Sequence, residues 1–189
     1  MIPPVKLCSR RVACENSKWT AYFDHIETAS GVEVTDYLTV SANGAAADLV
    51  SGVTVIPVTK SGDIVLLRNW RHAIECYCWE GVRGFIDERE EPAQAAMREL
   101  TEETGLTCDA ADLRPLGLIT PEASTIAGRA ALFVAQRCQP GGELDRHEPG
   151  LAEATVFERD EVRDMLANFE IEDATTVACL YRYFGSQPE

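Results

Sequence analysis

The chain has 189 residues, 46% of them hydrophobic, and a formal net charge of −14 from 17 basic and 31 acidic side chains. This length and composition predict one globular domain with a full core and room for a small additional segment. The acidic balance and the lack of a basic run argue against a nucleic-acid partner, because clustered Lys and Arg hold phosphate backbones. An anionic ligand is therefore expected to be small.

The start of the chain, the lengths of its apolar runs and its cysteines together predict where the protein is located. Residues 1–6 lack the apolar core of a signal peptide, and no run approaches the ~18 apolar residues of a membrane span. The seven cysteines are scattered without a Cys-x-x-Cys pair, which favours reduced thiols over disulfides or a zinc site. Packing explains Cys76 and Cys78 better than metal binding, because they share an apolar strand face. We expect a cytoplasmic protein with no membrane partner.

Two N-terminal segments, 19–27 and 32–40, are rich in β-branched and aromatic residues and flank a turn that contains glycine. They predict a β-hairpin. A lone hairpin is marginally stable in water, so this one must pack on the main domain or on a second chain. A small, mostly neutral linker follows it. We therefore expect an N-terminal β segment over 1–48 and the main domain over 49–189.

The main domain combines apolar strands with helices. The near-continuous apolar character of its first two strands predicts that they are covered on both faces. The segment 140–150 has no periodicity and is expected to form a long functional loop. The predicted strands are 53–58, 64–68, 74–80, 116–120, 130–135 and 153–157, and the predicted later helices are 159–167 and 172–184.

The segment from Gly84 to Leu106 has the pattern of a loop, a helix and a stop. Pro92 suits the first helical turn, and Gly105 suits the left-handed position after the last turn. Side chains at three- and four-residue spacing predict the helix face that packs on the core. The members of this stripe are Ala93, Ala96, Met97, Leu100 and Thr104.

Three glutamates are expected beside this stripe. At about 100° per residue, Glu99 and Glu103 are neighbours along one edge, and Glu102 lies about 60° further toward solvent. Like charges at these spacings repel, and the helix C-terminus is already negative. A hard divalent cation such as Mg²⁺ or Mn²⁺ removes this cost, because both prefer carboxylate and carbonyl oxygens. A solvated acidic helix face is the alternative.

The spacing of the whole segment resembles the box of the Nudix hydrolases. That box is Gly, five residues, Glu, seven residues, Arg-Glu, an aliphatic residue, any residue, Glu-Glu, any residue, Gly and an aliphatic residue. The chain supplies Gly84, Glu90, Arg98, Glu99, Leu100, Glu102, Glu103, Gly105 and Leu106. The resemblance implies an α+β fold, an α/β/α sandwich around a mixed sheet, preceded here by the N-terminal β-hairpin.

The resemblance also implies roles for residues in and beside the box. Glu99, Glu103 and the backbone carbonyl of Arg83 would hold Mg²⁺ or Mn²⁺. Glu102 would be a further metal ligand with a part in catalysis. Arg98 would hold a box carboxylate in place and so support catalysis by orienting a metal ligand without binding the metal itself.

Further matches point to the ADP-ribose and nucleotide-sugar branch of the family. By this resemblance Arg71 would contact the substrate diphosphate, and Glu80 would contact the metal ions or their water. A surface salt bridge is the alternative for Arg71. The general base of the branch lies in a late loop, where Glu148 is the best-placed candidate and Glu143 the next. A solvated loop acid is the alternative there.

Two N-terminal aromatics, Trp19 and Tyr37, resemble the pair that clasps the adenine in this branch, where the N-terminal sheet joins a partner subunit. Ordinary strand packing is the alternative. The chain departs from the branch in two places. Val82-Arg83 stands where Pro-Ala is usual, and residues 121–124 are not the usual Ser-Pro-Gly loop. The second departure leaves open which group forms the end of the substrate away from the adenine.

The resulting hypothesis is metal-assisted hydrolysis of the diphosphate in a small nucleoside diphosphate derivative. ADP-ribose is the first substrate, giving AMP and ribose 5-phosphate, and a nucleotide sugar such as GDP-mannose is the alternative. A nucleotide-sensing module without catalysis is a different hypothesis, and a purely structural acidic domain is a third. A homodimer is expected from the resemblance alone.

Overall fold

The computed structural model describes residues 4–45, 48–144 and 150–186. By its internal contacts the chain divides into two compact units. The first unit comprises Met1–Ser51 and Thr120–Arg129, and the second comprises Gly52–Ile119 and Ala130–Glu189. No helix in the described ranges is long and apolar enough to cross a membrane.

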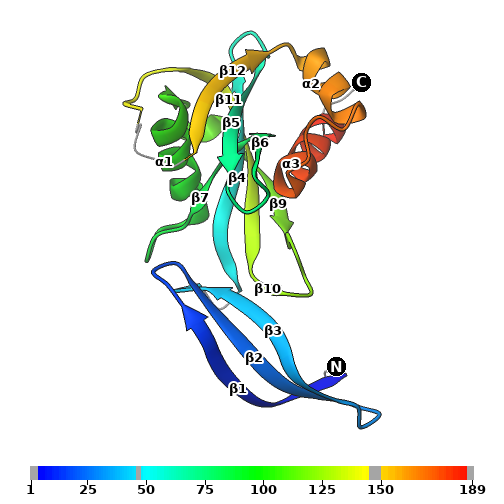
Figure 1. The fold of residues 1–189 in the computed structure, drawn as a ribbon. Helices are drawn as coiled ribbons and strands as arrows, with labels where there is room; N and C mark the ends of the chain where they lie inside the picture. The colour runs from blue at the N-terminus through cyan, green and yellow to red at the C-terminus, as the bar shows by residue number, and fades with distance from the viewer. Residues whose placement is uncertain (1–3, 46–47, 145–149, 187–189) are drawn as a thin grey trace. The chain divides into compact units, whose positions relative to one another are not determined.

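The first unit is a sheet in the order β1-β2-β3-β10 (Figure 1). Its strands are β1 (Val5–Glu15), β2 (Trp19–Thr28), β3 (Glu33–Ala42) and β10 (Ile126–Ala127). The predicted hairpin is confirmed as the antiparallel pair β2 and β3, and its turn holds Gly31 at a φ of +83°. The strand β1 was not predicted, because this edge strand is exposed along its whole length and shows no alternation between buried and exposed residues.

A buried carboxylate links three strands of this sheet. Asp24 on β2 accepts two hydrogen bonds of 2.7 Å from the Arg10 guanidinium on β1. Thr39 on β3 donates a third, at 3.0 Å. The bonds from Arg10 lower the pKa of Asp24, so the carboxylate stays ionised although it is buried.

The second unit is a mixed sheet between helices. Its strand order is β12-β5-β4-β11-β8, with β6 paired to β5, β7 to β4 and β9 to β11. The strands are β4 (Val50–Thr59), β5 (Ile64–Arg71), β6 (Cys76–Glu80), β7 (Val82–Phe85), β8 (Leu106–Thr107), β9 (Leu113–Ile119), β11 (Arg129–Pro140) and β12 (Leu151–Phe157). Helix α1 (Pro92–Thr104) lies on one side of the sheet, and α2 (Arg159–Ala167) and α3 (Ala174–Gly185) lie on the other (Figure 1). The predicted α+β fold with an α/β/α sandwich is confirmed.

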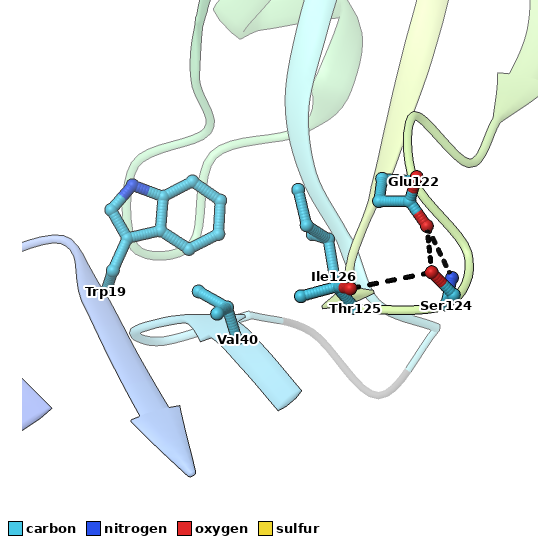
Figure 2. Close-up of a pocket in the computed structure, with 6 residues that line it drawn as sticks. All are labelled: Trp19, Val40, Glu122, Ser124, Thr125 and Ile126. Carbon is cyan, nitrogen blue, oxygen red and sulfur yellow. Dashed lines mark hydrogen bonds between the residues drawn. The ribbon is translucent and has the colours of Figure 1, made fainter. Parts of the chain in front are cut away.

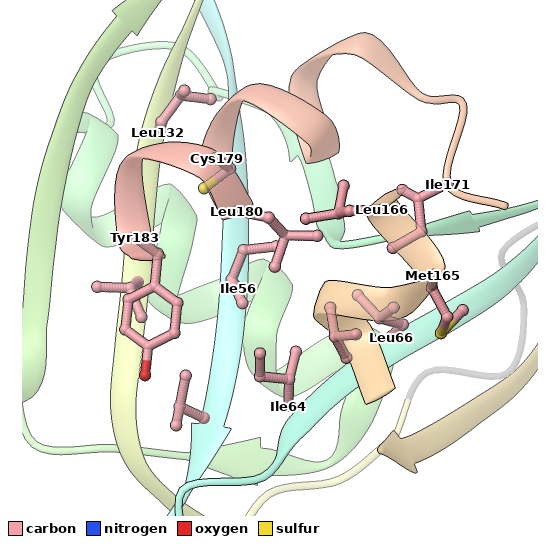
Figure 3. Close-up of a cluster of buried hydrophobic side chains, with 13 residues drawn as sticks. Ile56, Ile64, Leu66, Leu132, Met165, Leu166, Ile171, Cys179, Leu180 and Tyr183 are labelled. Carbon is pink, nitrogen blue, oxygen red and sulfur yellow. The ribbon is translucent and has the colours of Figure 1, made fainter. Parts of the chain in front are cut away.

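Consecutive residues of β4 point to opposite faces of the sheet, and both sets are buried because helices cover both faces. Ile56 and Val58 pack in the apolar cluster formed with α2 and α3, which Figure 3 shows around Leu180. Val53 and Val55 have the opposite parity and are buried as well, so they lie on the other face. An apolar run in a central strand therefore serves two layers at once, as predicted from its composition.

The helix limits follow the predicted ones closely. Helix α1 begins at Pro92, and Gly105 follows it with a φ of +67°, the left-handed conformation that favours glycine. Helix α2 has the predicted bounds. Helix α3 begins two residues later than predicted, because the Asp173 side chain accepts the backbone N–H of Thr176 and so caps the helix.

Candidate functional site

The glutamates of the box lie on the buried face of α1. Glu99 and Glu103 are only 9% and 3% exposed. Ala95 is buried with them and Ala93 is exposed, so the predicted stripe is wrong at its first position. The buried face is turned toward Ala95 because the helix packs its glutamates against the backbone of β7. Glu99 and Glu103, which were predicted at the edge of the packed stripe, are therefore buried.

Gly84 on β7 makes room for one of these carboxylates. A Cβ atom at Gly84 would lie 1.8 Å from Oε1 of Glu99, so any side chain there would displace the carboxylate. One residue earlier, the backbone N–H of Arg83 donates to Oε2 of Glu103 at 3.2 Å. Two consecutive backbone positions of β7 therefore face the two buried glutamates of α1.

Arg98 connects the acidic side chains of the box. Its guanidinium donates to Glu99 at 2.7 Å and to Glu102 at 3.0 Å. It also donates twice to Glu90, at 3.0 and 2.9 Å, and once to the carbonyl of Phe85, at 2.9 Å. The bonds from Arg98 lower the pKa of Glu90, and the same contacts raise the pKa of Arg98. One cation thus orders three carboxylates on the loop and the helix.

These oxygens suit a hard divalent cation in type. Carboxylates of α1 lie against the backbone of β7, and carboxylate and carbonyl oxygens are the donors that Mg²⁺ and Mn²⁺ prefer. Within the described ranges, no three His, Cys, Asp or Glu side chains already converge as a metal cage. Oxygens of Glu99 and Glu102 accept from Arg98, and one of Glu103 accepts from β7. The donor chemistry fits a metal ion, and the carboxylates have other partners in this state.

Arg71 and Glu80 form a buried ion pair on neighbouring strands. The Glu80 side chain is 2% exposed, and its Oε1 accepts from Nε of Arg71 at 2.7 Å. A second bond joins Nη2 of Arg71 to Oε2, and the Asn69 amide approaches Oε2 at 3.4 Å. The surface salt bridge considered for Arg71 is therefore a pair with an interior carboxylate. The Arg71 side chain itself remains 35% exposed, so a ligand has access to it.

Asp173 is a further member of this region and was not predicted from the sequence. Its Oδ1 accepts from Nη1 of Arg83 at 2.7 Å, and its Oδ2 caps α3. Burial alone would raise the pKa of Asp173, but Arg83 and the threonine donors outweigh it and lower the pKa. The capping pattern of Asp173 followed by Thr176 is a sequence signal for the helix start, although it does not reveal the contact with Arg83.

Trp19 lines a cavity of about 480 Å³ in the first unit. The other lining residues are Val40, Glu122, Ser124, Thr125 and Ile126. Figure 2 shows the Trp19 indole and Val40 on one side of the cavity and Glu122 and Ser124 on the other. The backbone N–H of Ser124 donates to the Glu122 carboxylate. The segment 121–124, which departs from the branch pattern, therefore contributes to the same cavity as Trp19.

Tyr37 does not lie beside Trp19 in the sheet. Trp19 pairs with Ala42, and Tyr37 pairs with Asp24, so five residue steps separate the two positions along β2. Five steps amount to about 17 Å and put the two side chains on opposite faces of the sheet. The Tyr37 hydroxyl nevertheless donates to the backbone carbonyl of Ser124, which lines the cavity of Trp19.

The proposed general base, Glu148, lies outside the described residues. Glu143 is described and exposed, in the segment that follows β11. The strand β11 extends to Pro140, further than the predicted end at residue 135. The assignment of a general base stays a prediction.

Known proteins resemble this chain in sequence and in fold. Residues 48–178 match the family model described as the NUDIX domain. An ADP-sugar pyrophosphatase of Mus musculus is 31% identical over 108 residues, which are 57% of this chain and 50% of the relative. An ADP-ribose pyrophosphatase of Bacillus subtilis (strain 168) is 40% identical over 55 residues, 29% of this chain and 30% of the relative. The matches thus span half or less of these relatives.

A solved structure of an ADP compounds hydrolase shares the fold, with a TM-score of 0.79 at 20% identity. The superposition covers 98% of this chain and 95% of the other.

Proposed function

Because this chain belongs to the NUDIX family, we propose that it is a metal-dependent hydrolase that cleaves the diphosphate of a nucleoside diphosphate derivative. The observation that carries the proposal is the pair of buried glutamates, Glu99 and Glu103, that α1 holds against β7. Burying carboxylates costs free energy unless cations and hydrogen bonds compensate for the lost water. A bound divalent cation would offset the free-energy cost of burying these two carboxylates.

The groups proposed to hold Mg²⁺ or Mn²⁺ are Glu99, Glu102, Glu103 and the backbone carbonyl of Arg83. When bound, the ion supplies positive charge for the phosphates and lowers the pKa of the attacking water. Arg98 orients the carboxylates of Glu99 and Glu102 through hydrogen bonds of 2.7 and 3.0 Å. Glu148 is the proposed base that accepts the proton of the attacking water, with Glu143 as the next candidate.

Arg71 is proposed to bind the substrate diphosphate. Its planar guanidinium suits phosphate oxygens, and the buried Glu80 holds it in one orientation. The proposed substrate is ADP-ribose, which would yield AMP and ribose 5-phosphate. Support comes from the similarity to an ADP-ribose pyrophosphatase and to an ADP-sugar pyrophosphatase.

The adenine is proposed to stack on Trp19 in its cavity, where Val40 and Ile126 add apolar contacts. Tyr37 lies on the other face of the sheet from Trp19 and donates its hydroxyl to the backbone carbonyl of Ser124, which lines this cavity. The homodimer is proposed from the resemblance to the branch alone. A cytoplasmic location also stays a prediction.

The proposal is tested by hydrolysis of ADP-ribose, GDP-mannose, UDP-glucose, NADH and a diadenosine polyphosphate, with Mg²⁺, with Mn²⁺ and with a chelator. We expect ADP-ribose to be cleaved fastest, to AMP and ribose 5-phosphate, and the chelator to abolish cleavage. Faster cleavage of GDP-mannose would correct the substrate and keep the reaction class. Binding of one compound without turnover of any would contradict the hydrolase and favour the sensing module.

A further inference from the structure

The cationic side chain of Arg83 lies between Glu80, at the end of β6, and Asp173, at the start of α3. Its Nη1 lies 2.7 Å from Oδ1 of Asp173 and 3.6 Å from Oε2 of Glu80. The two carboxylates are 14% and 2% exposed, and the Arg83 side chain is 33% exposed. The guanidinium therefore joins the segment before the box to the start of α3 through largely buried partners.

A second link joins the same two elements. The backbone N–H of Gly81 donates to Oγ1 of Thr176 at 3.0 Å. Thr176 in turn donates its hydroxyl to Oδ2 of Asp173 at 2.8 Å, and its backbone N–H donates to the same oxygen at 2.8 Å. Asp173 thus uses one oxygen to cap α3 and the other to hold Arg83. The helix start and the segment from Gly81 to Arg83 form one hydrogen-bonded unit.

The backbone of Arg83 faces the site while its side chain faces α3. Its N–H donates to Glu103, and its carbonyl is a proposed metal ligand. Glycines flank this short segment at positions 81 and 84, and glycine backbones lose more conformational freedom on ordering than other residues. Both glycines are needed for space, since a Cβ at Gly81 would lie 2.8 Å from the carbonyl oxygen of Val55. Pairing of β7 with β4 orders this backbone from one side, and the Arg83 side chain adds a second constraint from the start of α3.

We infer that Arg83 and Asp173 are a positioning pair that fixes the Arg83 carbonyl for a small divalent cation. The inference rests on the proposed function, which makes that carbonyl a metal ligand. Mg²⁺ requires near-ideal octahedral geometry at 2.0–2.1 Å, whereas Ca²⁺ accepts a flexible oxygen shell at 2.3–2.6 Å. Loss of the brace therefore weakens Mg²⁺ more than Ca²⁺.

Electrostatics alone predicts the opposite sign. Removal of the guanidinium leaves Glu80 and Asp173 with less positive charge nearby, which would draw every cation closer. A purely structural role predicts a lower melting temperature without a change in metal selectivity. The ratio of Mg²⁺ to Ca²⁺ affinity separates the three explanations.

The experiment measures the binding of Mg²⁺ alone and of Ca²⁺ alone to the full chain by calorimetry, with melting temperature by circular dichroism. The variants are Arg83→Ala, Asp173→Asn and the double variant, because asparagine keeps a helix cap and removes the charge. We expect each single change to weaken Mg²⁺ binding about 10-fold and Ca²⁺ binding less than about 3-fold. The double variant should be no weaker than either single one, because the pair acts as a unit. Arg83→Lys should recover part of the loss.

A matched control exists in the same unit. Arg137 pairs with Asp112 at 2.6 Å, and Asp112 is 12% exposed, close to the 14% of Asp173, although the Arg137 side chain is 65% exposed against 33% for Arg83. Arg137→Ala and Asp112→Asn should leave Mg²⁺ binding unchanged. If Arg83→Ala does not fold, Asp173→Asn carries the test with its cap intact.

The inference is overturned by unchanged or tighter Mg²⁺ binding in Arg83→Ala, by equal losses of Mg²⁺ and Ca²⁺, or by losses that multiply in the double variant. Glu103→Gln separates this failure from a failure of the proposed function. If the unaltered chain binds Mg²⁺ and Glu103→Gln does not, the metal site stands and only the role of the pair is wrong. If the unaltered chain binds no Mg²⁺, both proposals fail.

Discussion

The two units of the chain treat their functional side chains in opposite ways. The second unit buries Glu99, Glu103 and Glu80, and each has partners supplied by the same unit. The first unit leaves β1 exposed along its length and keeps Trp19 and Tyr37 on opposite faces of one sheet. The acidic side chains therefore find their partners inside one unit, whereas Trp19 and Tyr37 approach the lining residue Ser124 from different positions of a single sheet.

The physical origin of the difference is the core. The second unit has helices on both faces of its sheet, so it can surround a carboxylate and satisfy it with guanidinium and backbone donors. The first unit is a single sheet layer, and its buried charge is held by strands of that layer alone, as Asp24 is by Arg10 and Thr39. Changes to the acidic side chains of the second unit should therefore act on turnover, and changes at Trp19 in the first unit on substrate affinity or assembly.

The largest effect is expected from Glu103→Gln. Glutamine keeps the size and an acceptor for the Arg83 N–H, so the fold should survive. Loss of the charge removes a metal ligand, and metal charge stabilisation is worth several kcal/mol in a transition state. At 1.36 kcal/mol per factor of ten, turnover should fall by at least about 100-fold in a steady-state assay.

The control for this change is Glu88→Gln, which removes one charge from an exposed position in the same motif. It should change turnover less than about 2-fold, because exposed charges contribute little. Normal turnover in Glu103→Gln would remove the basis for the metal assignment.

A smaller effect is expected from Gly84→Ala. The added methyl would lie 1.8 Å from the Glu99 carboxylate, which is the movable end of a side chain, so the carboxylate should shift while the fold remains. Turnover should fall about 10- to 100-fold, with a melting temperature close to that of the unaltered chain. Gly185→Ala is the matched control, because a methyl there would meet nothing within 4 Å. Equal activity of the two variants would show that Glu99 needs no fixed position.

The smallest effect is expected from Trp19→Ala. Base stacking on an aromatic ring is worth about 1–3 kcal/mol, so KM should rise about 5- to 160-fold while kcat changes little. Tyr181→Ala is the control, since it removes an exposed aromatic ring from α3, outside the residues that line the cavity. Loss of a dimer in gel filtration without a change in KM would instead assign Trp19 to packing.

Local patterns allowed much of the second unit to be predicted. The limits of α1 follow from Pro92 and Gly105, because helix ends are governed by backbone chemistry within a few residues. The buried strands follow from apolar runs that serve both faces of the sheet. The box residues are recognised because their spacing in the chain is itself the signal.

Other features depended on contacts between distant residues. The strand β1 has no burial pattern, since its role is to pair at a sheet edge. The burial of Ala95 in place of Ala93 is decided by the approach of α1 to β7. Likewise, the pairing of Arg83 with Asp173 joins positions ninety residues apart, and no periodicity reports such a contact.

The helix limits and the spacing of the acidic side chains follow from the sequence, because propensity, capping and spacing are local properties, and the fold class follows from the resemblance of the box to the Nudix hydrolases. Which of these side chains are buried, and what each one contacts, depends on the tertiary structure. It turned Glu99 and Glu103 inward, gave Arg71 to Glu80, and separated Trp19 from Tyr37. Burial and partner choice depend on which surfaces meet when the elements pack, and that is a property of the whole fold.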